Sequence, residues 1–419
     1  MKTKYDLIVV GGGFAGAAAA IAAARQNVDV QLIERYNALG GAAINCLVMP
    51  FMHYTTTMPG AEEKTYLCGD LFREMVAEMD KIAKKVTNGT PFDEEILKLV
   101  LNRMAVASGV QLLYNTSVTE VCRESDRILS VKALGKSRVM EFTADYFIDA
   151  TGDAELSMLA GCPSKVGREK DGLCQPMTLC FRMGGVDKEK FFRTRTQINP
   201  LYKELKAKGH FKNPREDVLI FDNFNDGVLH FNTTRIVKHD PTDPFAITQA
   251  EIDAREQVFE MLDFLKANFE AFKNARILST ALQIGIRESR KVIGEYTLTQ
   301  EDLKALTRFP DGIATANYDI DIHNPEGAGT SHYYFGKGEW YEIPYRCLIP
   351  KGMDNLLVAG RCISSTHEAQ ASYRIMPFCA ELGQAAGTAV AVAKETATDT
   401  RHVNVEQVRA ILRAEGFQI

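Results

Sequence analysis

Paired cysteines are missing from this chain. Its nine cysteines are scattered along 419 residues, their number is odd, and no C-x-x-C pair occurs. These absences disfavour a disulfide framework and a clustered zinc or iron–sulfur site. The sequence therefore predicts reduced thiols and no metal. Only Cys46 stands apart, because it follows closely on a glycine pair.

Basic runs and long apolar runs are lacking as well. Lysine and arginine number 49 against 54 acidic residues, and no basic segment carries interleaved aromatics. This balance argues against a nucleic-acid partner. After residue 24 no charge-free apolar stretch is long enough to span a bilayer, so we expect no integral membrane segment. The expected location is the cytoplasm, and the composition is compatible with a homo-oligomer.

A nucleotide-binding pattern is present at the start of the chain. An apolar run over residues 6–10 leads into Gly11-x-Gly13-x-x-Gly16, an alanine-rich helix and a second apolar run that ends at Glu34. The three glycines suit the tight turn, the approach of a pyrophosphate and close helix–strand packing. The helix start would offer N–H groups to phosphates, and Glu34 would accept from a ribose hydroxyl. A signal peptide over residues 1–24 is the alternative, but the glycine spacing speaks against it.

Four further segments place small residues at or near the ends of predicted elements. The glycine pair in Gly40-Gly41-Ala42 would let the backbone wrap closely around a nucleotide. A strand over 146–150 runs into Ala150-Thr151-Gly152, and a strand over 355–359 ends on Gly360-Arg361. An apolar helix over 376–394 is interrupted at Gly383–Gly387. All four segments would bring backbone close to a ligand.

In their order along the chain these motifs resemble the FAD-dependent oxidoreductases of the glutathione-reductase-like superfamily. The resemblance implies FAD, held without a covalent bond, with Glu34 at the adenosine ribose and backbone near Val118 at the adenine. It also implies that a helix starting near Gly383 points its positive end toward the flavin pyrimidine edge. The residues expected to contact FAD are Gly11, Gly13, Phe14, Ala15, Gly16, Glu34, Arg35, Gly40, Gly41, Ala42, Val118, Ala150, Thr151, Gly152, Gly360, Arg361, Gly383, Gln384, Ala385 and Ala386.

The fold implied by the resemblance is α/β. We expect a three-layer, Rossmann-like FAD-binding domain with a β-meander, built from residues 1–170 and 350–419, with a helical excursion near 50–95. An α+β substrate or cap domain would occupy residues 171–349. Apolar periodicity predicts further helices over the ranges 71–86, 94–107, 188–196, 201–208 and 249–275, the third and fourth being separated by Pro200.

A second G-x-G-x-x-G is absent, so we expect no separate NAD(P)H domain. The flavin would exchange a hydride at N5 with a small polar or anionic organic substrate directly, and with an electron acceptor that the sequence does not identify. One alternative is a double-bond reductase resembling fumarate or geranylgeranyl reductases. Another is a non-catalytic protein that keeps the flavin fold for binding. A halogenase is disfavoured, because Trp340 is the only tryptophan of a segment that would need a pair.

Four side chains are candidates for catalysis or substrate contact: His53, Arg346, His367 and Arg374. Hydride transfer needs a proton acceptor or donor, a role that histidine fills, and arginine holds carboxylates at two points. Cys46 and His53 are the positions to examine for a covalent flavin link. Arg287 and Arg290 are predicted to form a structural ion-pair cluster with Glu288 on a helix. His323 and His332 flank a glycine-rich loop, but their spacing does not support a metal site.

Overall fold

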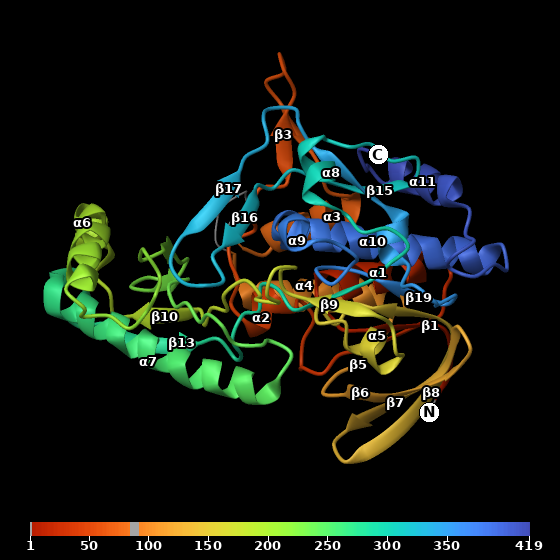
Figure 1. Cartoon of the computed structure of the whole chain (residues 1–419), viewed down its shortest axis with the longest axis horizontal. Coiled ribbons are helices and arrows are strands. Elements are labelled where there is room, and N and C mark those ends of the chain that lie inside the picture. Colours follow the sequence, from red (N-terminus) through yellow and green to blue (C-terminus); the bar gives the residue numbers. More distant parts are fainter. Residues whose placement is uncertain (1, 84–91) are drawn as a thin grey trace.

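A seven-stranded sheet forms the centre of the chain, of which the computed structural model describes residues 2–83 and 92–419. β1 (Lys4–Val10) pairs in parallel with β2 (Val30–Ile33) on one side and with β8 (Arg138–Asp149) on the other. β1 and β2 are almost entirely buried, as expected for a parallel sheet covered on both faces. The Rossmann-like α/β prediction is thus confirmed (Figure 1).

The sheet is extended at both sides. β5 (Gln111–Leu113) adds to β2, and β19 (Leu356–Val358), far away in sequence, pairs in parallel with the end of β8. β7 (Arg127–Gly135) pairs antiparallel with β8, and β6 (Ser117–Glu124) pairs antiparallel with β7, which forms the predicted β-meander. The central sheet is therefore assembled from segments that lie far apart in the sequence.

Two helices pack against each other beside the sheet, α1 (Phe14–Arg25) and α10 (Met376–Glu395). A Cβ on Gly383 would lie 2.0 Å from the carbonyl oxygen of Ala15, so these helices meet backbone to backbone. The predicted interruption at Gly383–Gly387 is wrong, since α10 runs through it without a break. These glycines permit close helix packing instead of ending a helix.

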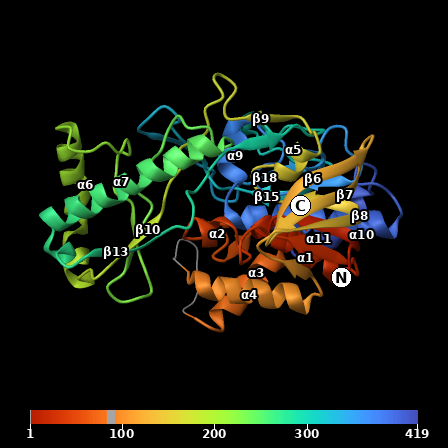
Figure 2. The ribbon, with the colours of Figure 1, turned by 90° about the horizontal axis from the view of Figure 1, so that it is seen from below.

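A second hydrophobic core is formed by residues between 177 and 284 together with Leu47. Its antiparallel sheet has the order β11 (Ile220–Asp222), β12 (Leu229–Phe231), β10 (Phe181–Gly184) and β13 (Arg276–Thr280). The long helices α6 (Lys188–Ala207) and α7 (Pro244–Asn268) belong to it and extend to the left in Figure 1 and Figure 2.

The predicted separation of two helices at Pro200 is also wrong. α6 continues through Pro200, because a proline removes a single N–H donor and the helix is held by packing on both sides of it. Phe191 and Ile198 before the proline and Tyr202 after it are buried in the second core. Tertiary packing offsets the cost of the lost hydrogen bond.

The two cores divide the chain differently from the expected domains. Buried residues between 292 and 349 belong to the first core, although they were expected in the substrate domain. The region near 50–95 holds a hairpin as well as helices, and residues 84–91, where one predicted helix was expected to end, lie outside the described part. Its elements are β3 (Thr55–Thr57), β4 (Lys64–Tyr66), α3 (Asp70–Asp80) and α4 (Glu94–Ala107).

The remaining elements are short or lie at the periphery. They are α2 (Ala42–Asn45), α5 (Glu155–Leu159), β9 (Ser164–Val166), η1 (Glu270–Phe272), β14 (Arg290–Val292), α8 (Gln300–Lys304), β15 (Gly312–Ala316), β16 (Ile320–His323), β17 (Thr330–Tyr333), β18 (Tyr341–Pro344), η2 (Tyr345–Leu348), α9 (His367–Tyr373) and α11 (Val405–Ala414). Within residues 2–83 and 92–419, no single helix has both the length and the apolar composition to cross a membrane. The pair α9 and α10, bent by 95°, meets those criteria only when taken together.

Candidate active site

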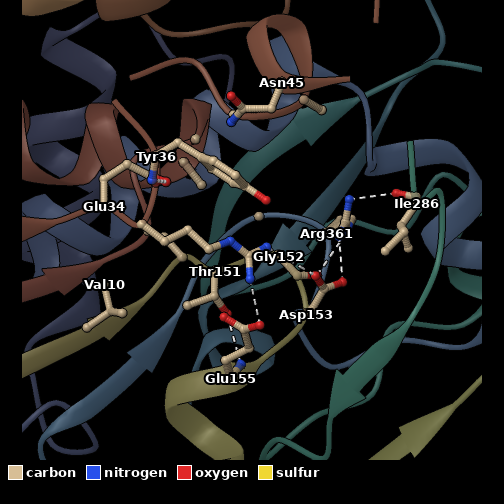
Figure 3. Close-up of a pocket in the computed structure, with 18 of the residues that line it drawn as sticks. Val10, Glu34, Tyr36, Asn45, Thr151, Gly152, Asp153, Glu155, Ile286 and Arg361 are labelled. Atoms are coloured by element: carbon tan, nitrogen blue, oxygen red, sulfur yellow. Dashed lines mark hydrogen bonds and ion pairs between the residues drawn. The ribbon is translucent and has the colours of Figure 1, made fainter. Parts of the chain in front are cut away.

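A cavity of about 420 Å³ opens where the parallel strands end (Figure 3). Its wall includes Val10 and Ile33, the last residues of β1 and β2, and Ala150 and Ala359, which directly follow β8 and β19. Ligands of open α/β sheets bind in this position, beyond the carboxyl ends of the strands. The topology therefore marks this cavity as the main candidate site.

The glycine turn after β1 forms one end of the cavity. Gly11 has a φ of +99°, and a Cβ there would lie 2.5 Å from the carbonyl oxygen of Ala150. A Cβ on Gly16 would lie 1.8 Å from the carbonyl oxygen of Gly11, so helix and turn touch directly. Gly13 differs, because a Cβ there would meet no atom closer than 3.9 Å. The three glycines serve turn, ligand approach and packing as expected from the motif.

The start of α1 is open to a ligand. Gly13 is its N-cap residue and supplies no side-chain acceptor for the first N–H groups. Such groups at a helix N-terminus bind phosphates. The backbone at Phe14 and Ala15 therefore faces the cavity with free donors.

Glu34 follows β2 and is held in place by backbone donors. The N–H groups of Gly12 and Tyr36 both donate to its carboxylate, the second at 2.8 Å. The residue is buried yet lines the cavity. Its carboxylate is thus fixed beside the glycine turn, where a ribose hydroxyl would be accepted.

Arg361 holds the turns after β8 and β19 together. Its guanidinium donates to the carbonyl oxygens of Gly152 at 2.8 Å and Ile286 at 2.6 Å, and to Asp153 Oδ1 at 2.6 Å (Figure 3). Burial alone would raise the pKa of Asp153, but the charge of Arg361 and its hydrogen bond, with that of Ser289, lower this pKa overall. Arg361 therefore shapes the cavity wall through contacts with the protein itself.

The far end of the cavity lies at the start of α10. Met376 and Cys379, in its first turn, line the wall together with Arg374. The positive end of the helix dipole is therefore directed at this end of the cavity. The helix start that faces the cavity lies at Met376, and not near Gly383 as predicted. Gly383, Gln384, Ala385 and Ala386 lie inside the helix and do not line the cavity.

Most of the other predicted FAD contacts are brought together by the fold. Those that line the cavity are Gly11, Gly13, Phe14, Ala15, Glu34, Arg35, Gly41, Ala42, Val118, Ala150, Thr151, Gly152, Gly360 and Arg361. Gly16 and Gly40 support the wall from behind, the latter by donating from its N–H to the Gly12 carbonyl oxygen at 2.8 Å. Cavity residues that the motifs did not indicate include Tyr36, Asn45, Asp153, Glu155 and Gln283.

Cys46 lines the cavity as a buried thiol. Burial raises its pKa to about 11, and Gln283 donates to its sulfur at 3.6 Å. Because the thiolate is the nucleophilic form of cysteine, this residue is unsuited to attack a flavin at neutral pH.

His367 does not lie in the cavity wall. It is buried at the start of α9, and its Nδ1 lies 2.6 Å from the Glu288 carboxylate, which Lys291 also contacts. Burial alone would raise the pKa of Glu288, but the hydrogen bond and charge of His367 and the charge of Lys291 lower it overall. The geometry gives His367 an internal ionic partner in place of a position at the flavin.

His53 and Arg346 also lie outside this cavity. The Nε2 atom of His53 is 3.3 Å from the carbonyl oxygen of Asn317, and the residue lines a second, smaller cavity. Arg346 is half exposed and pairs with Asp311, its Nε lying 2.8 Å from Oδ2. Of the four candidate side chains, only Arg374 lines the main cavity.

The expected helix with Arg287, Glu288 and Arg290 is absent. β14 begins at Arg290 and the preceding residues are irregular, because Gly285 forms an antiparallel bridge with Thr178 instead. Glu288 pairs with Lys291 and His367, so Arg287 is left out of the expected ion-pair cluster. The contacts of Arg287 are described below.

One group of side chains could approach a cation. Asp319, Asp321 and His332 place ligand atoms within 4.8 Å of one another. However, Arg374 already lies 3.4 Å from Asp321, and this positive charge disfavours a second cation there. The expectation of no metal site remains a prediction.

Comparisons with known proteins agree with this architecture. Residues 6–412 match the family model described as FAD dependent oxidoreductase. A digeranylgeranylglycerophospholipid reductase from Methanocella arvoryzae is 30% identical over 178 residues, which make up 40% of this chain and 42% of that protein. The match thus spans less than half the length of this curated relative.

Two solved structures are similar over most of the chain. A geranylgeranyl bacteriochlorophyll reductase-like protein from Thermoplasma acidophilum is 12% identical with a TM-score of 0.48, covering 98% of this chain and 84% of that one. A flavin-dependent brominase is 13% identical with a TM-score of 0.48, covering 98% and 83%.

Proposed function

This chain belongs to the family of FAD-dependent oxidoreductases, and on that premise we propose that it transfers a hydride between a small polar or anionic organic substrate and N5 of bound FAD. The family makes the chain an enzyme, so the non-catalytic binding protein is not retained. FAD supplies two-electron chemistry at N5 when it is bound.

The continuous cavity is the observation that carries this proposal. It extends from the open N–H groups of α1 and the fixed Glu34 carboxylate, past Gly152 and Gly360, to the first turn of α10. Gly13 supplies space that a side chain would fill. These features fit a pyrophosphate at one end and a flavin ring at the other, with the pyrimidine edge near the positive helix end.

The residues of the chain would bind and orient rather than react covalently. Glu34 holds the ribose, the α1 backbone holds the phosphates, and Arg361 fixes the two turns that face the flavin. Ile284 and Ile286, which belong to the edge of the second core, form part of the cavity wall. Their apolar side chains exclude water from that part of the cavity. Exclusion of water strengthens the electrostatic contacts inside the site.

Anaerobic titration of the purified protein tests this proposal. We expect visible flavin absorbance and its bleaching by at least one donor from a panel of alcohols, hydroxy acids, sugars and amines. The flavin should remain in solution after acid precipitation of the protein, because Cys46 is protonated and no bond holds the cofactor. A colourless protein that does not take up FAD would contradict the proposal.

A double-bond reductase is the second candidate, supported by the partial similarity to a digeranylgeranylglycerophospholipid reductase. Anaerobic titration also distinguishes oxidation of a donor from reduction of a double bond. If no donor of the panel bleaches the flavin, while chemically reduced protein is reoxidised anaerobically by an enoate, the reaction runs in the direction of double-bond reduction.

A further inference from the structure

Four arginines gather where the two cores meet, beside the end of the cavity at which α10 begins. Arg215 and Arg235 come from the second core's segments, Arg287 from the irregular stretch before β14, and Arg374 from the end of α9. Repulsion from Arg374, Arg215 and Arg235 and attraction by Asp321 all act on the charge of Arg287, so these groups share one region. A buried positive charge is costly unless an anion lies beside it.

Three of these arginines have a carboxylate of the chain as partner. The pairs are Arg215 with Asp217 at 2.8 Å, Arg235 with Glu216 at 3.1 Å, and Arg374 with Asp321 at 3.4 Å. Their charges are therefore compensated within the protein.

Arg287 has only neutral partners. Its Nη1 donates to the carbonyl oxygen of Pro176 at 2.8 Å and to Thr178 Oγ1 at 2.7 Å. Across residues 2–83 and 92–419, no carboxylate lies within ion-pair distance of it. Burial, and then the charge of Arg374, lower its pKa to about 9, so it stays protonated at neutral pH. Asp321, which pairs with Arg374, attracts Arg287 at longer range and raises its pKa in part, so Arg287 is the one arginine of the group without an ion-pair partner of its own.

The segment that carries Arg287 borders the proposed flavin site, although Arg287 itself is not among the residues that line the cavity. Ile286, the residue before Arg287, lines the cavity (Figure 3), and so does Arg374. Gln370 of α9 donates to the carbonyl oxygen of Arg287 at 2.8 Å, which ties Arg287 to the helix that ends at Arg374. The Nε of Arg374 is itself buried without a hydrogen-bond partner. The unused donor of Arg374 and the guanidinium of Arg287, which has no ion-pair partner, therefore belong to two adjoining segments.

We propose that Arg287, together with Arg374, binds a carboxylate of the substrate, so that the substrate class is an organic monocarboxylic acid. This inference rests on the proposed oxidoreductase function. A carboxylate brings a single negative charge and accepts two hydrogen bonds from a guanidinium fork. A phosphate monoester would bring a charge of about −1.5 to −2, more than one arginine without an ion-pair partner balances.

Binding of simple anions to the FAD-loaded protein tests the inference without knowledge of the true substrate. Benzoate and acetate are titrated while the flavin spectrum is recorded, with benzamide, acetamide and inorganic phosphate as comparisons. We expect the two carboxylates to bind and to perturb the spectrum. R287Q and R374Q should each lower the affinity for benzoate at least about tenfold, because each removes a hydrogen bond from a charged donor to the carboxylate. R193Q, on an exposed arginine of α6, is the matched control and should change nothing.

Thermal unfolding shows whether the variants are correctly folded. R287Q keeps an N–H donor for the carbonyl oxygen of Pro176 but removes a buried positive charge that has no ion-pair partner. Its Tm without anion should therefore equal or exceed that of the wild type. Benzoate should raise the Tm of the wild type and of R193Q but not of R287Q.

The outcomes separate this inference from the function on which it rests. Flavin-loaded protein that binds benzoate equally well in all variants, or binds phosphate or benzamide more tightly than benzoate, overturns the carboxylate site and leaves the oxidoreductase intact. Protein that takes up no FAD overturns the proposed function itself.

Discussion

Arg361 Nη2 lies 2.6 Å from Asp153 Oδ1, and this ion pair joins the turn after β19 to the turn after β8. The two turns are some two hundred residues apart in sequence, yet both form the cavity wall. Their alignment depends on a buried contact between opposite charges, which neither turn could hold alone.

Replacing Asp153 should therefore damage both stability and cofactor binding. D153N leaves Arg361 buried without its counter-charge, for which we expect a loss of about 3–5 kcal/mol in the free energy of unfolding. Because the folded-state pKa of Asp153 is lowered, the stability from this pair is present above the unfolded-state pKa and is lost as the pH falls through the folded value. Urea unfolding measures both effects. D171N, in the exposed pair with Arg168, is the control, and an equal loss there would contradict the assignment.

Two neighbouring glycines should respond differently to alanine. In G13A the new methyl group meets no atom of the chain closer than 3.9 Å but enters the cavity, so the protein should fold with an unchanged apo Tm and lose most of its FAD. In G16A the methyl group would lie 1.8 Å from the Gly11 carbonyl oxygen, and the Tm itself should fall. Flavin-to-protein stoichiometry and thermal unfolding distinguish the two results. A G13A protein with full FAD content would show that the nucleotide lies elsewhere.

His367 is expected to act through Glu288 and not on the substrate. H367A removes a partner of the fully buried Glu288 carboxylate and should cost about 1–3 kcal/mol. H367N, which offers an amide donor near the position of Nδ1, should recover part of that loss. Chemical unfolding together with the flavin reduction rate decides the question. Unchanged stability with abolished reduction in both variants would instead make His367 catalytic.

Glu381 should make the protein less stable as the pH rises. It lies inside α10, where burial raises its pKa well above the ordinary value although Thr315 donates to it. Between the unfolded-state and folded-state pKa values, the native protein holds a proton that the unfolded chain has released. Stability therefore falls with rising pH by up to about 1.4 kcal/mol per pH unit across that window. E381Q should remove this slope in urea unfolding at several pH values, whereas the exposed E62Q should retain it.

The nucleotide half of the site could be predicted from sequence because its determinants are local. The turn from Gly11 to Gly16 and the acid at Glu34 depend on residues close together in one β-α-β unit, and backbone geometry requires their type. Ala150 and Gly360 could be placed as well, because each lies within two residues of the end of a buried strand.

The substrate half could not be predicted in the same way, because long-range pairing decides it. His367 resembled a catalytic residue until Glu288, 79 positions away, was found to be its partner. Arg287 was assigned to an ion pair because its sequence neighbour is acidic, yet Glu288 pairs with Lys291 and His367 instead. Gly383 resembled a helix start, but its small size serves contact with Ala15, which no local pattern shows.

The backbone contact between α1 and α10 also determines when α1 can become packed during synthesis of the chain. A nascent chain exposes the cofactor turn early, but α1 cannot bury its α10-facing side until residues 376–395 have been synthesised. An alanine-rich helix with no packing partner is marginally stable in water. The turn that carries the nucleotide motif is thus expected to reach its final geometry only after α10 has been synthesised.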